Sequence, residues 1–280
     1  MDIRSKLIET IENFVEEHPG NIGEDGGRYF AAPLVGFASA QDQLFEDYKR
    51  IIGTFHWTPA EVLAHAEPPP ETFHGGTVVS WILPVSEPVR LSNRAENRYP
   101  SRPWAHVRNF GELFNDEIRN MVVVFLKERG GRAAAPMLLE NWRRVDDPDI
   151  GWASTWSERH ASYVAGLGTF SINDGLITPL GIAHRCGSVV TDIVMEPTSR
   201  PYGDYRENCL LCRGEKCGVC IERCPVGAIS EDGHDKDLCE RYTYGNPFKS
   251  LAKKYKAKHI GCGLCQTDVP CESRIPRNAG

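Results

Sequence analysis

The first twenty residues alternate apolar and charged positions in a regular way. The apolar residues recur at helical spacing and are Ile3, Leu7, Ile8, Ile11 and Phe14. This spacing predicts an amphipathic helix, because such residues fall on one face of a helix. Charged residues interrupt every apolar stretch, so the segment predicts neither a signal peptide nor a membrane span. We therefore expect a cytoplasmic protein without a membrane partner.

Strand-like and helix-like patterns then alternate up to about residue 196. The strand-like stretches, bounded by Gly and Pro or rich in Val, Thr and Ile, are 28–40, 75–88, 132–140 and 186–196. The stretches with helical spacing are 41–53, 109–131 and 157–168. Helices that alternate with strands are typical of a layered fold in which helices cover a sheet. The fold class predicted is α/β (α+β), with an α/β sandwich as the first domain.

Cysteine is distributed unevenly along the chain. Nine of the ten cysteines lie between Cys209 and Cys271, and only Cys186 precedes them. Segment 196–208 is rich in Pro, Gly and polar residues and separates the cysteine-poor part of the chain from the cysteine-rich part. Such a composition is typical of a linker between domains. We expect domains at 1–200 and 201–280. In a reducing compartment, such crowded cysteines favour metal binding over disulfides.

The spacing of these cysteines indicates which metal group they bind. Cys217, Cys220 and Cys224, followed by Pro225, form C-x2-C-x3-C-P, which is the later part of the bacterial ferredoxin run. The first ligand of that run must come from upstream, and both Cys209 and Cys212 remain open. The second half is less regular and contains Cys239, Cys262, Cys265 and Cys271.

In two-cluster ferredoxins, the last cysteine of each run binds the other cluster. That rule assigns one cluster to Cys217, Cys220, Cys271 and either Cys209 or Cys212. The other cluster takes Cys224, Cys239, Cys262 and Cys265. We therefore expect two 4Fe-4S clusters in a ferredoxin-like electron-transfer domain. Structural zinc is the alternative, since C-x2-C pairs also suit tetrahedral thiolate sites, but the C-x3-C-P element favours iron-sulfur cubes.

Composition and charge narrow the possible partners. The chain has 280 residues, 41% of them hydrophobic, and a net charge of -6, values that indicate a folded protein and argue against a general nucleic-acid binder. The lysine-rich stretch 249–259 is the exception. We expect it to form the solvated face of a helix.

Several short motifs carry a resemblance to a known group of enzymes. They are Glu158, the AGLG at 165–168, the GLIT at 175–178, the pair Thr191 and Asp192, and the cysteine runs that follow. With them, residues of about 80–271 resemble the superfamily of cobalamin-dependent iron-sulfur reductases, which contains epoxyqueuosine reductases and reductive dehalogenases. The resemblance implies a nitroreductase-like domain that holds base-off cobalamin close to one cluster of a ferredoxin-like domain. The implied partners are a low-potential electron donor of the ferredoxin or flavodoxin type and a small-molecule substrate or corrinoid partner.

The resemblance also suggests individual site residues. Trp104, Trp152, His184 and Cys186 fall in stretches that would approach the cofactor, with ordinary packing as the alternative for each. His106 and Arg108 would face the substrate side of the corrin and are the catalytic candidates.

The sequence departs from the resemblance at positions that would donate protons. Trp104 and Phe110 stand where epoxyqueuosine reductases would have tyrosines, and Trp152 and Ala153 stand near the place of an aspartate. Neither Trp nor Phe can act as a general acid, which needs a group that titrates near the working pH. We therefore expect a pocket without the usual proton donors.

Three functions follow from these observations. The first is a redox protein that passes low-potential electrons through two clusters to cobalamin, for electron transfer or for reduction of a small organic substrate. The second is a ferredoxin-type carrier without cobalamin. The third is an epoxyqueuosine reductase that acts on tRNA, which the acidic charge and the end of the chain at Gly280 disfavour, so that nucleic acid is not an expected partner.

Overall fold

The centre of the molecule is a small antiparallel sheet. A computed structural model describes residues 2–66, 74–148 and 150–277. In this part of the chain the sheet has the strand order β1-β2-β8-β3. Its strands are β1 (Leu34–Ser39), β2 (Thr77–Pro84), β8 (His184–Thr191) and β3 (Ala133–Ala134). Every residue of β2 is buried, as expected of an inner strand covered on both faces.

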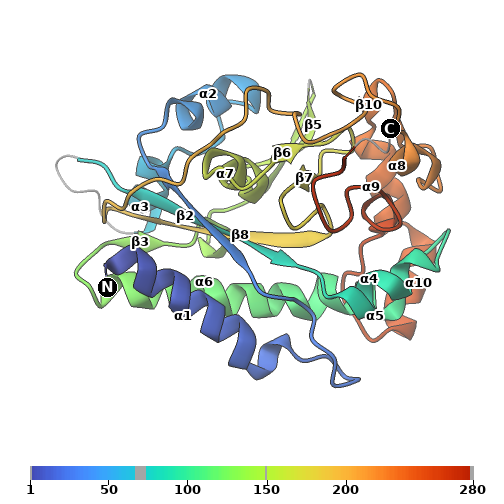
Figure 1. Cartoon of the computed structure of the whole chain (residues 1–280), viewed down its shortest axis with the longest axis horizontal. Helices are drawn as coiled ribbons and strands as arrows, with labels where there is room; N and C mark the ends of the chain where they lie inside the picture. Colours follow the sequence, from blue (N-terminus) through green and yellow to red (C-terminus); the bar gives the residue numbers. More distant parts are fainter. Residues whose placement is uncertain (1, 67–73, 149, 278–280) are drawn as a thin grey trace.

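Helices cover both faces of this sheet (Figure 1). One face carries α1 (Ile3–Glu17) and α6 (Glu112–Lys127), and the other carries α2 (Gln43–Ile51), α3 (Pro59–Ala66) and α7 (Glu158–Val164). Side chains alternate along β2, so Val79 and Trp81 pack into the core of the first face while Val78 and Ile82 pack into that of the second. The predicted mixed α/β class is confirmed.

Shorter elements connect these layers. They are α4 (Glu87–Arg94), α5 (Arg102–His106), a π-helical turn (Val107–Gly111), the hairpin of β4 (Arg144–Asp147) and β5 (Gly151–Ser154), and the pair β6 (Thr169–Phe170) and β7 (Leu176–Ile177). Short 3-10 helices lie at Pro19–Asn21, Pro136–Leu138 and Leu264–Gln266.

The predicted strand 132–140 is much shorter than expected. Only Ala133 and Ala134 pair with β8. Pro136 begins a 3-10 helix directly afterwards, and proline has no N–H to continue a sheet ladder. The prediction of a strand over the whole stretch was therefore wrong.

The last seventy residues contain short elements and pack against the helical layers. The elements are α8 (Val219–Glu222), β9 (Ile229–Ser230), β10 (Gly233–His234), α9 (Lys236–Tyr244) and α10 (Asn246–Lys254). One apolar cluster joins Ile177 and Ile182 to Ile229 and Val269, and another joins Ala105 to Phe248. The domain boundary near residue 200 stays a prediction. No helix in the described ranges is long and apolar enough to cross a membrane.

Candidate functional site

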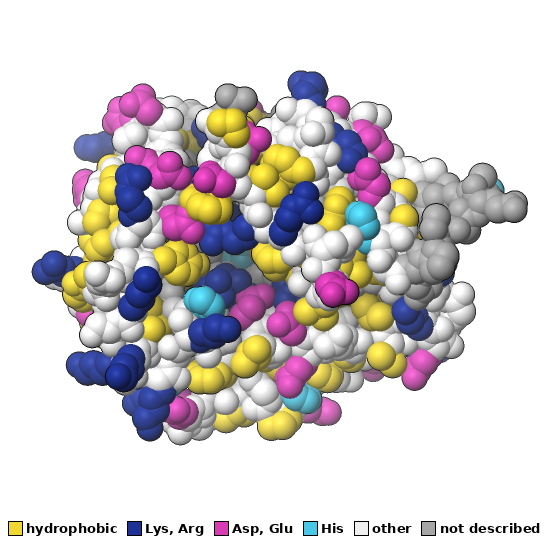
Figure 2. Space-filling model, turned by 180° about the vertical axis from the view of Figure 1, so that it is seen from behind, with side chains coloured by type: hydrophobic (Ala, Val, Ile, Leu, Met, Phe, Trp, Pro, Cys, Tyr) yellow, Lys and Arg dark blue, Asp and Glu magenta, His cyan; other side chains and the backbone are white. Residues whose placement is uncertain are grey.

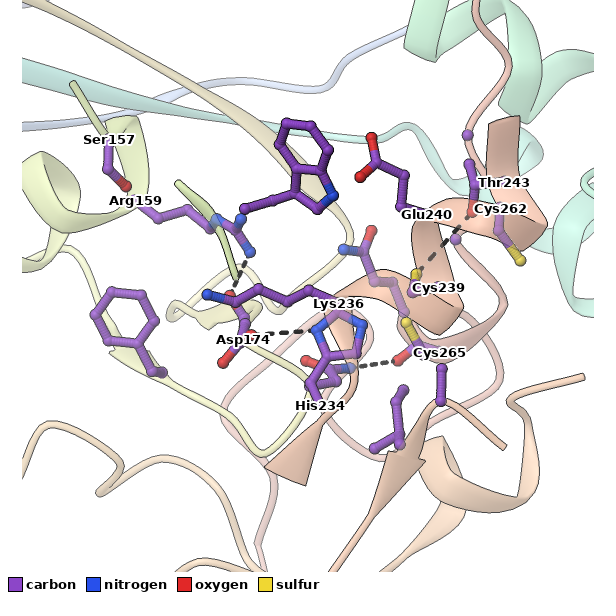
Figure 3. Close-up of a pocket in the computed structure, with 18 of the residues that line it drawn as sticks. Ser157, Arg159, Asp174, His234, Lys236, Cys239, Glu240, Thr243, Cys262 and Cys265 are labelled. Atoms are coloured by element: carbon purple, nitrogen blue, oxygen red, sulfur yellow. Dashed lines mark hydrogen bonds and ion pairs between the residues drawn. The ribbon is translucent and has the colours of Figure 1, made fainter. Parts of the chain in front are cut away.

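A large cavity lies where the cysteine-rich segment meets the sheet layers. Its volume is about 1110 Å³, which exceeds the roughly 300–1,000 Å³ of common small-molecule sites. Aromatic side chains form much of its wall, among them Trp104, Trp152, Tyr163 and Phe170. Cysteines of the C-terminal segment form another part of the same wall, as the close-up in Figure 3 shows.

Trp104 and Trp152, the two aromatic residues that the sequence places near a cofactor, both line this cavity. Trp104 is almost fully buried and lies against Gly263. Trp152 is covered by the guanidinium of Arg144, 4.6 Å from its ring centre. Trp156 instead belongs to the core and donates a hydrogen bond to Ser188 over 2.9 Å.

His184 also lines the cavity. Its Nε2 lies 2.8 Å from the carbonyl oxygen of Leu176 and therefore carries the proton. Its Nδ1 is buried without a partner among the described residues. Burial lowers the pKa of His184 to about 4, so the ring is neutral at pH 7.

Cys186 and His106 have other surroundings. Cys186 lies opposite Ile82 in the sheet and is not among the cavity-lining residues. Burial, followed by the charge of Glu158, raises the pKa of its thiol to about 11. His106 is buried, with its Nε2 2.8 Å from the carbonyl oxygen of Tyr255, and it does not line the cavity either. Neither Cys186 nor His106 lines the cavity, whereas Arg108 does reach its wall.

One group of thiols opens onto the cavity. Cys224, Cys239, Cys262 and Cys265 all line it. The backbone N–H of Ala228 donates to the sulfur of Cys224 over 3.2 Å. Burial and the neighbouring thiols raise the pKa of Cys262 to about 12. Buried thiolates are unfavourable unless a cation neutralises them, so the donor set suits a metal cluster.

A second group of thiols surrounds a smaller cavity of about 20 Å³. Its lining includes Cys209, Cys217, Cys220 and Cys271. Cys212 is not part of this lining. Of the two residues that the sequence left open, Cys209 is therefore the one that the fold brings to the other three.

The thiols are not packed around a single point. A single zinc ion needs its sulfur ligands at about 2.3 Å, and among the residues that the structure describes no three Cys, His, Asp or Glu side chains are grouped closely enough to hold one ion. An iron-sulfur cube needs only that four thiols surround a larger group.

The cavity contains titratable side chains that the sequence did not reveal. His234 Nδ1 lies 3.1 Å from Asp174 Oδ2, and Arg159 donates to the carbonyl oxygen of Asp174 (Figure 3). Burial opposes the charge of His234, but hydrogen bonds to Asp174 and Cys239 raise its pKa to about 9. The cavity therefore contains other proton-donating groups, although Trp and Phe stand where the usual donors were expected. Asp174 and His234 are sixty positions apart, and no spacing rule links them.

A second polar pair lies on the same wall. Ser157 Oγ and His160 Nδ1 are 2.7 Å apart. Burial, followed by the charge of His56, lowers the pKa of His160 to about 3. His160 is thus a neutral hydrogen-bonding group at pH 7.

A buried charge network lies beneath the wall. Arg119 is 1% exposed and pairs with Glu112 at 3.0 Å, Asp116 at 2.6 Å and Glu158 at 3.2 Å. Glu112 also pairs with Arg185. Ser188 donates to Glu158, whose pKa is raised by burial. Glu158, part of the family resemblance, therefore anchors α7 to α6 and β8.

Comparisons with known proteins find the expected group of enzymes. No protein-family model matches the chain. The trichloroethene reductive dehalogenase of Dehalococcoides mccartyi is 28% identical over 129 residues, which cover 45% of this chain and 21% of that protein. The epoxyqueuosine reductase of Bacillus cereus is 31% identical over 119 residues, 41% of this chain and 29% of that protein. The matched stretches therefore span less than a third of either relative.

Solved structures of these two kinds of enzyme share the fold. An epoxyqueuosine reductase bound to a modified tRNA stem-loop matches with a TM-score of 0.53 and 17% identity, over 96% of this chain and 65% of that one. A reductive dehalogenase described with a mechanism for B12-dependent dehalogenation matches with a TM-score of 0.51 and 17% identity, over 87% and 30%. The resemblance predicted from the sequence is confirmed.

One expectation about partners is overturned by these comparisons. Nucleic acid was not expected, because the chain is acidic. The structural neighbour with a tRNA stem-loop shows that this fold accommodates a nucleic-acid substrate. Net charge describes the whole molecule and says little about one local surface.

Proposed function

We propose that this chain, whose neighbours are epoxyqueuosine reductases and reductive dehalogenases, is a cobalamin-dependent iron-sulfur reductase. Residues 1–200 would form a nitroreductase-like domain that binds the corrinoid, and residues 201–280 a ferredoxin-like domain with two 4Fe-4S clusters. The observation that carries the proposal is the shared wall of the large cavity. Cys224, Cys239, Cys262 and Cys265 line the same space as Trp104 and Trp152.

The two thiol groups would hold the clusters in sequence. Cys209, Cys217, Cys220 and Cys271 would bind the outer cluster, and the group on the cavity wall would bind the inner one. When bound, the clusters supply single low-potential electrons, and a reduced corrinoid supplies a strong nucleophile for removing a leaving group or oxygen from a small organic substrate.

The side chains of the cavity would bind and orient the ligands. Trp104 and Trp152 offer flat apolar surfaces of the kind that pack against a ring system. His184 donates its Nε2 proton to the carbonyl oxygen of Leu176, which holds its ring in one orientation at the cavity wall. We call Cys224, Cys239, Cys262 and Cys265 the inner thiol group. Asp174 and His234 would hold a proton close to this group, and general acid catalysis requires such a positioned donor.

Anaerobic reconstitution tests this proposal. The full chain is incubated with iron and sulfide, and then with hydroxocobalamin, and gel filtration removes unbound cofactor. We expect a brown protein with roughly eight iron and eight sulfide per chain and one bound cobalamin in the base-off form. A cluster-loaded chain that does not retain cobalamin would instead be a ferredoxin-type carrier. A colourless chain with stoichiometric zinc would refute the iron-sulfur assignment.

Action on tRNA is a second candidate function, and one surface favours it. Lys249, Lys253 and Lys254 of α10 are exposed, and α10 lies in sequence between Tyr244 and Gly261, which both line the cavity. Figure 2 shows Lys and Arg side chains, together with Asp and Glu, around a hollow on one face of the molecule. Such local positive charge is what phosphate contacts require.

Binding of an epoxyqueuosine-containing tRNA stem-loop tests the second candidate. We expect the double variant Lys253→Glu and Lys254→Glu to bind it at least tenfold more weakly, and the binding to weaken with salt. Lys6→Glu is the control, because Lys6 is an exposed residue of α1. Equal binding by the wild-type chain and the double variant would rule out this surface.

A further inference from the structure

Two arginines from different elements reach the wall of the large cavity. Arg108 belongs to the π-helical turn that follows α5, and Arg185 belongs to β8. Both line the cavity and are half-buried. The Cγ of Arg108 lies against Gly261, 3.2 Å from the place that a side chain there would occupy. Arg108 is thereby fixed beside the loop that leads to Cys262.

The two guanidinium groups act on each other. The charge of Arg185 is the largest influence on Arg108 and, with burial, lowers the pKa of that residue. Arg108 nevertheless remains charged at neutral pH, as arginines in proteins do. Arg185 pairs with Glu112, and Glu112 begins α6 one turn after Arg108, so both arginines lie on the same part of the cavity wall. The charge of Arg108 creates a local positive potential there.

The carboxylates of the neighbourhood are already engaged. Arg119 pairs with Glu112, Asp116 and Glu158, and Glu112 also pairs with Arg185. The hydrogen-bond partner of Arg108 is the side chain of Tyr244. Among the described residues, no carboxylate forms an ion pair with Arg108.

We infer that Arg108 and Arg185 form an anion-binding subsite in the cavity, which takes a carboxylate or phosphate group. Guanidinium groups match these planar or tetrahedral anions with paired hydrogen bonds. Arg185 is fixed by Glu112 and Arg108 by Gly261 and Tyr244, so both donors are held in place before a ligand binds.

The anion has two chemical sources. One is the phosphodiester in the nucleotide loop of cobalamin, and the other is an anionic group on the substrate. Either assignment of the source rests on the proposed function, whereas the binding of an anion by the two arginines does not.

Titration of the full chain with inorganic phosphate and with benzoate, followed calorimetrically without cofactors, tests the subsite. The variant is Arg108→Gln, because Arg185 is tied into the buried network. Arg144→Gln is the matched control, since Arg144 also lines the cavity but is already paired with Glu240 at 2.8 Å. A charged hydrogen bond contributes about 1.5–3 kcal/mol, so we expect the Kd of at least one probe to rise tenfold or more in Arg108→Gln and less than twofold in Arg144→Gln. No saturable binding by the wild-type chain, or equal Kd values for wild type and Arg108→Gln, would overturn the subsite.

Two corrinoids distinguish the sources. Cobinamide lacks the nucleotide loop and its phosphodiester, whereas hydroxocobalamin has both. If the anion belongs to the cofactor, Arg108→Gln weakens binding of cobalamin but not of cobinamide. If it belongs to the substrate, both corrinoids bind Arg108→Gln as they bind the wild type, while the loss of phosphate or benzoate binding persists. A chain that binds no corrinoid but shows the Arg108-dependent anion binding would refute the proposed function and leave the subsite standing.

Discussion

The indole of Trp104 occupies the space that a side chain at position 263 would need. A Cβ added to Gly263 would lie 2.1 Å from Cε2 of Trp104, and Gly263 has a φ of 70°. Both the space and the left-handed backbone therefore require glycine between Cys262 and Cys265. This contact joins the aromatic wall of the cavity to the loop that carries two cysteines of the inner thiol group.

Replacement of Gly263 by alanine should displace this loop. We expect Gly263→Ala to destabilise the chain by about 1–3 kcal/mol through overpacking, and to reduce the iron content of the reconstituted protein by about half, because one cluster of two loses its geometry. Urea unfolding and iron analysis measure the two effects.

Gly214→Ala is the matched control for that variant. Gly214 has a similar φ of 78°, but nothing lies within 4 Å of an added Cβ. We expect it to cost about 1 kcal/mol from the backbone alone and to leave the iron content unchanged. Equal iron loss in both variants would mean that the contact with Trp104 does not matter for the cluster.

The fold distinguishes between Cys209 and Cys212. Cys209 lines the small cavity with Cys217, Cys220 and Cys271, and Cys212 does not. We expect Cys209→Ser to lose about half of the iron and sulfide, and Cys212→Ser to retain all of it. Iron analysis and electron paramagnetic resonance of the reduced variants measure this difference. The opposite pattern would show that the loop rearranges when the cluster forms.

The ionisation of Glu112 should make the free energy of unfolding depend on pH in the acid range. Burial would raise its pKa, but Arg185 and Arg119 outweigh burial and lower the pKa from 4.5 to about 2. A lowered pKa means that the stabilisation is present above about pH 4.5 and is lost as the pH falls towards 2. The lowered pKa of Glu112 corresponds to a stabilisation of about 3 kcal/mol. We expect Glu112→Gln to be less stable than the wild type at pH 7 by an amount of this order, and the difference to narrow by pH 3. A difference that is constant with pH would contradict the ion-pair role.

Among the residues of the buried charge network, replacement of Arg119 should lower the free energy of unfolding the most. Its removal in Arg119→Met leaves Glu158 without its ion-pair partner and Glu112 with Arg185 alone, and breaking a buried ion pair costs about 3–5 kcal/mol. Arg102→Met is the control, because the pair of Arg102 with Glu24 is about half exposed and exposed pairs contribute about 0–1 kcal/mol. Urea midpoints that change equally in the two variants would refute this ranking.

The sequence predicted most of the elements that form the central sheet and its two helical layers. The apolar spacing of α1 and α6 and the continuous apolar run of β2 each suffice to identify an element. Cysteine spacing, together with the crossed pattern of ferredoxins, predicts two sets of cluster ligands, and the thiols of these two sets line two different cavities. Their binding of clusters stays a prediction.

The remaining features depend on contacts between distant residues. The strand order β1-β2-β8-β3 and its antiparallel pairing follow from packing, which local patterns do not encode. Arg119 looks like a polar position of an amphipathic helix but is buried. The pairs Asp174 with His234 and Arg108 with Arg185 join segments that no motif connects.

The central claim is that a cluster bound by Cys224, Cys239, Cys262 and Cys265 would pass electrons to a corrinoid in the cavity. Stopped-flow spectroscopy of the reconstituted chain with bound cobalamin tests this claim, with dithionite as the reductant. The wild type is compared with Cys262→Ser and Cys212→Ser, after cobalamin uptake has been verified for each protein. We predict that bound cobalamin is reduced at similar rates in the wild type and in Cys212→Ser, and at least tenfold more slowly in Cys262→Ser. Equal rates in all three proteins, or a wild-type chain that retains iron-sulfur clusters but no cobalamin, would contradict the account.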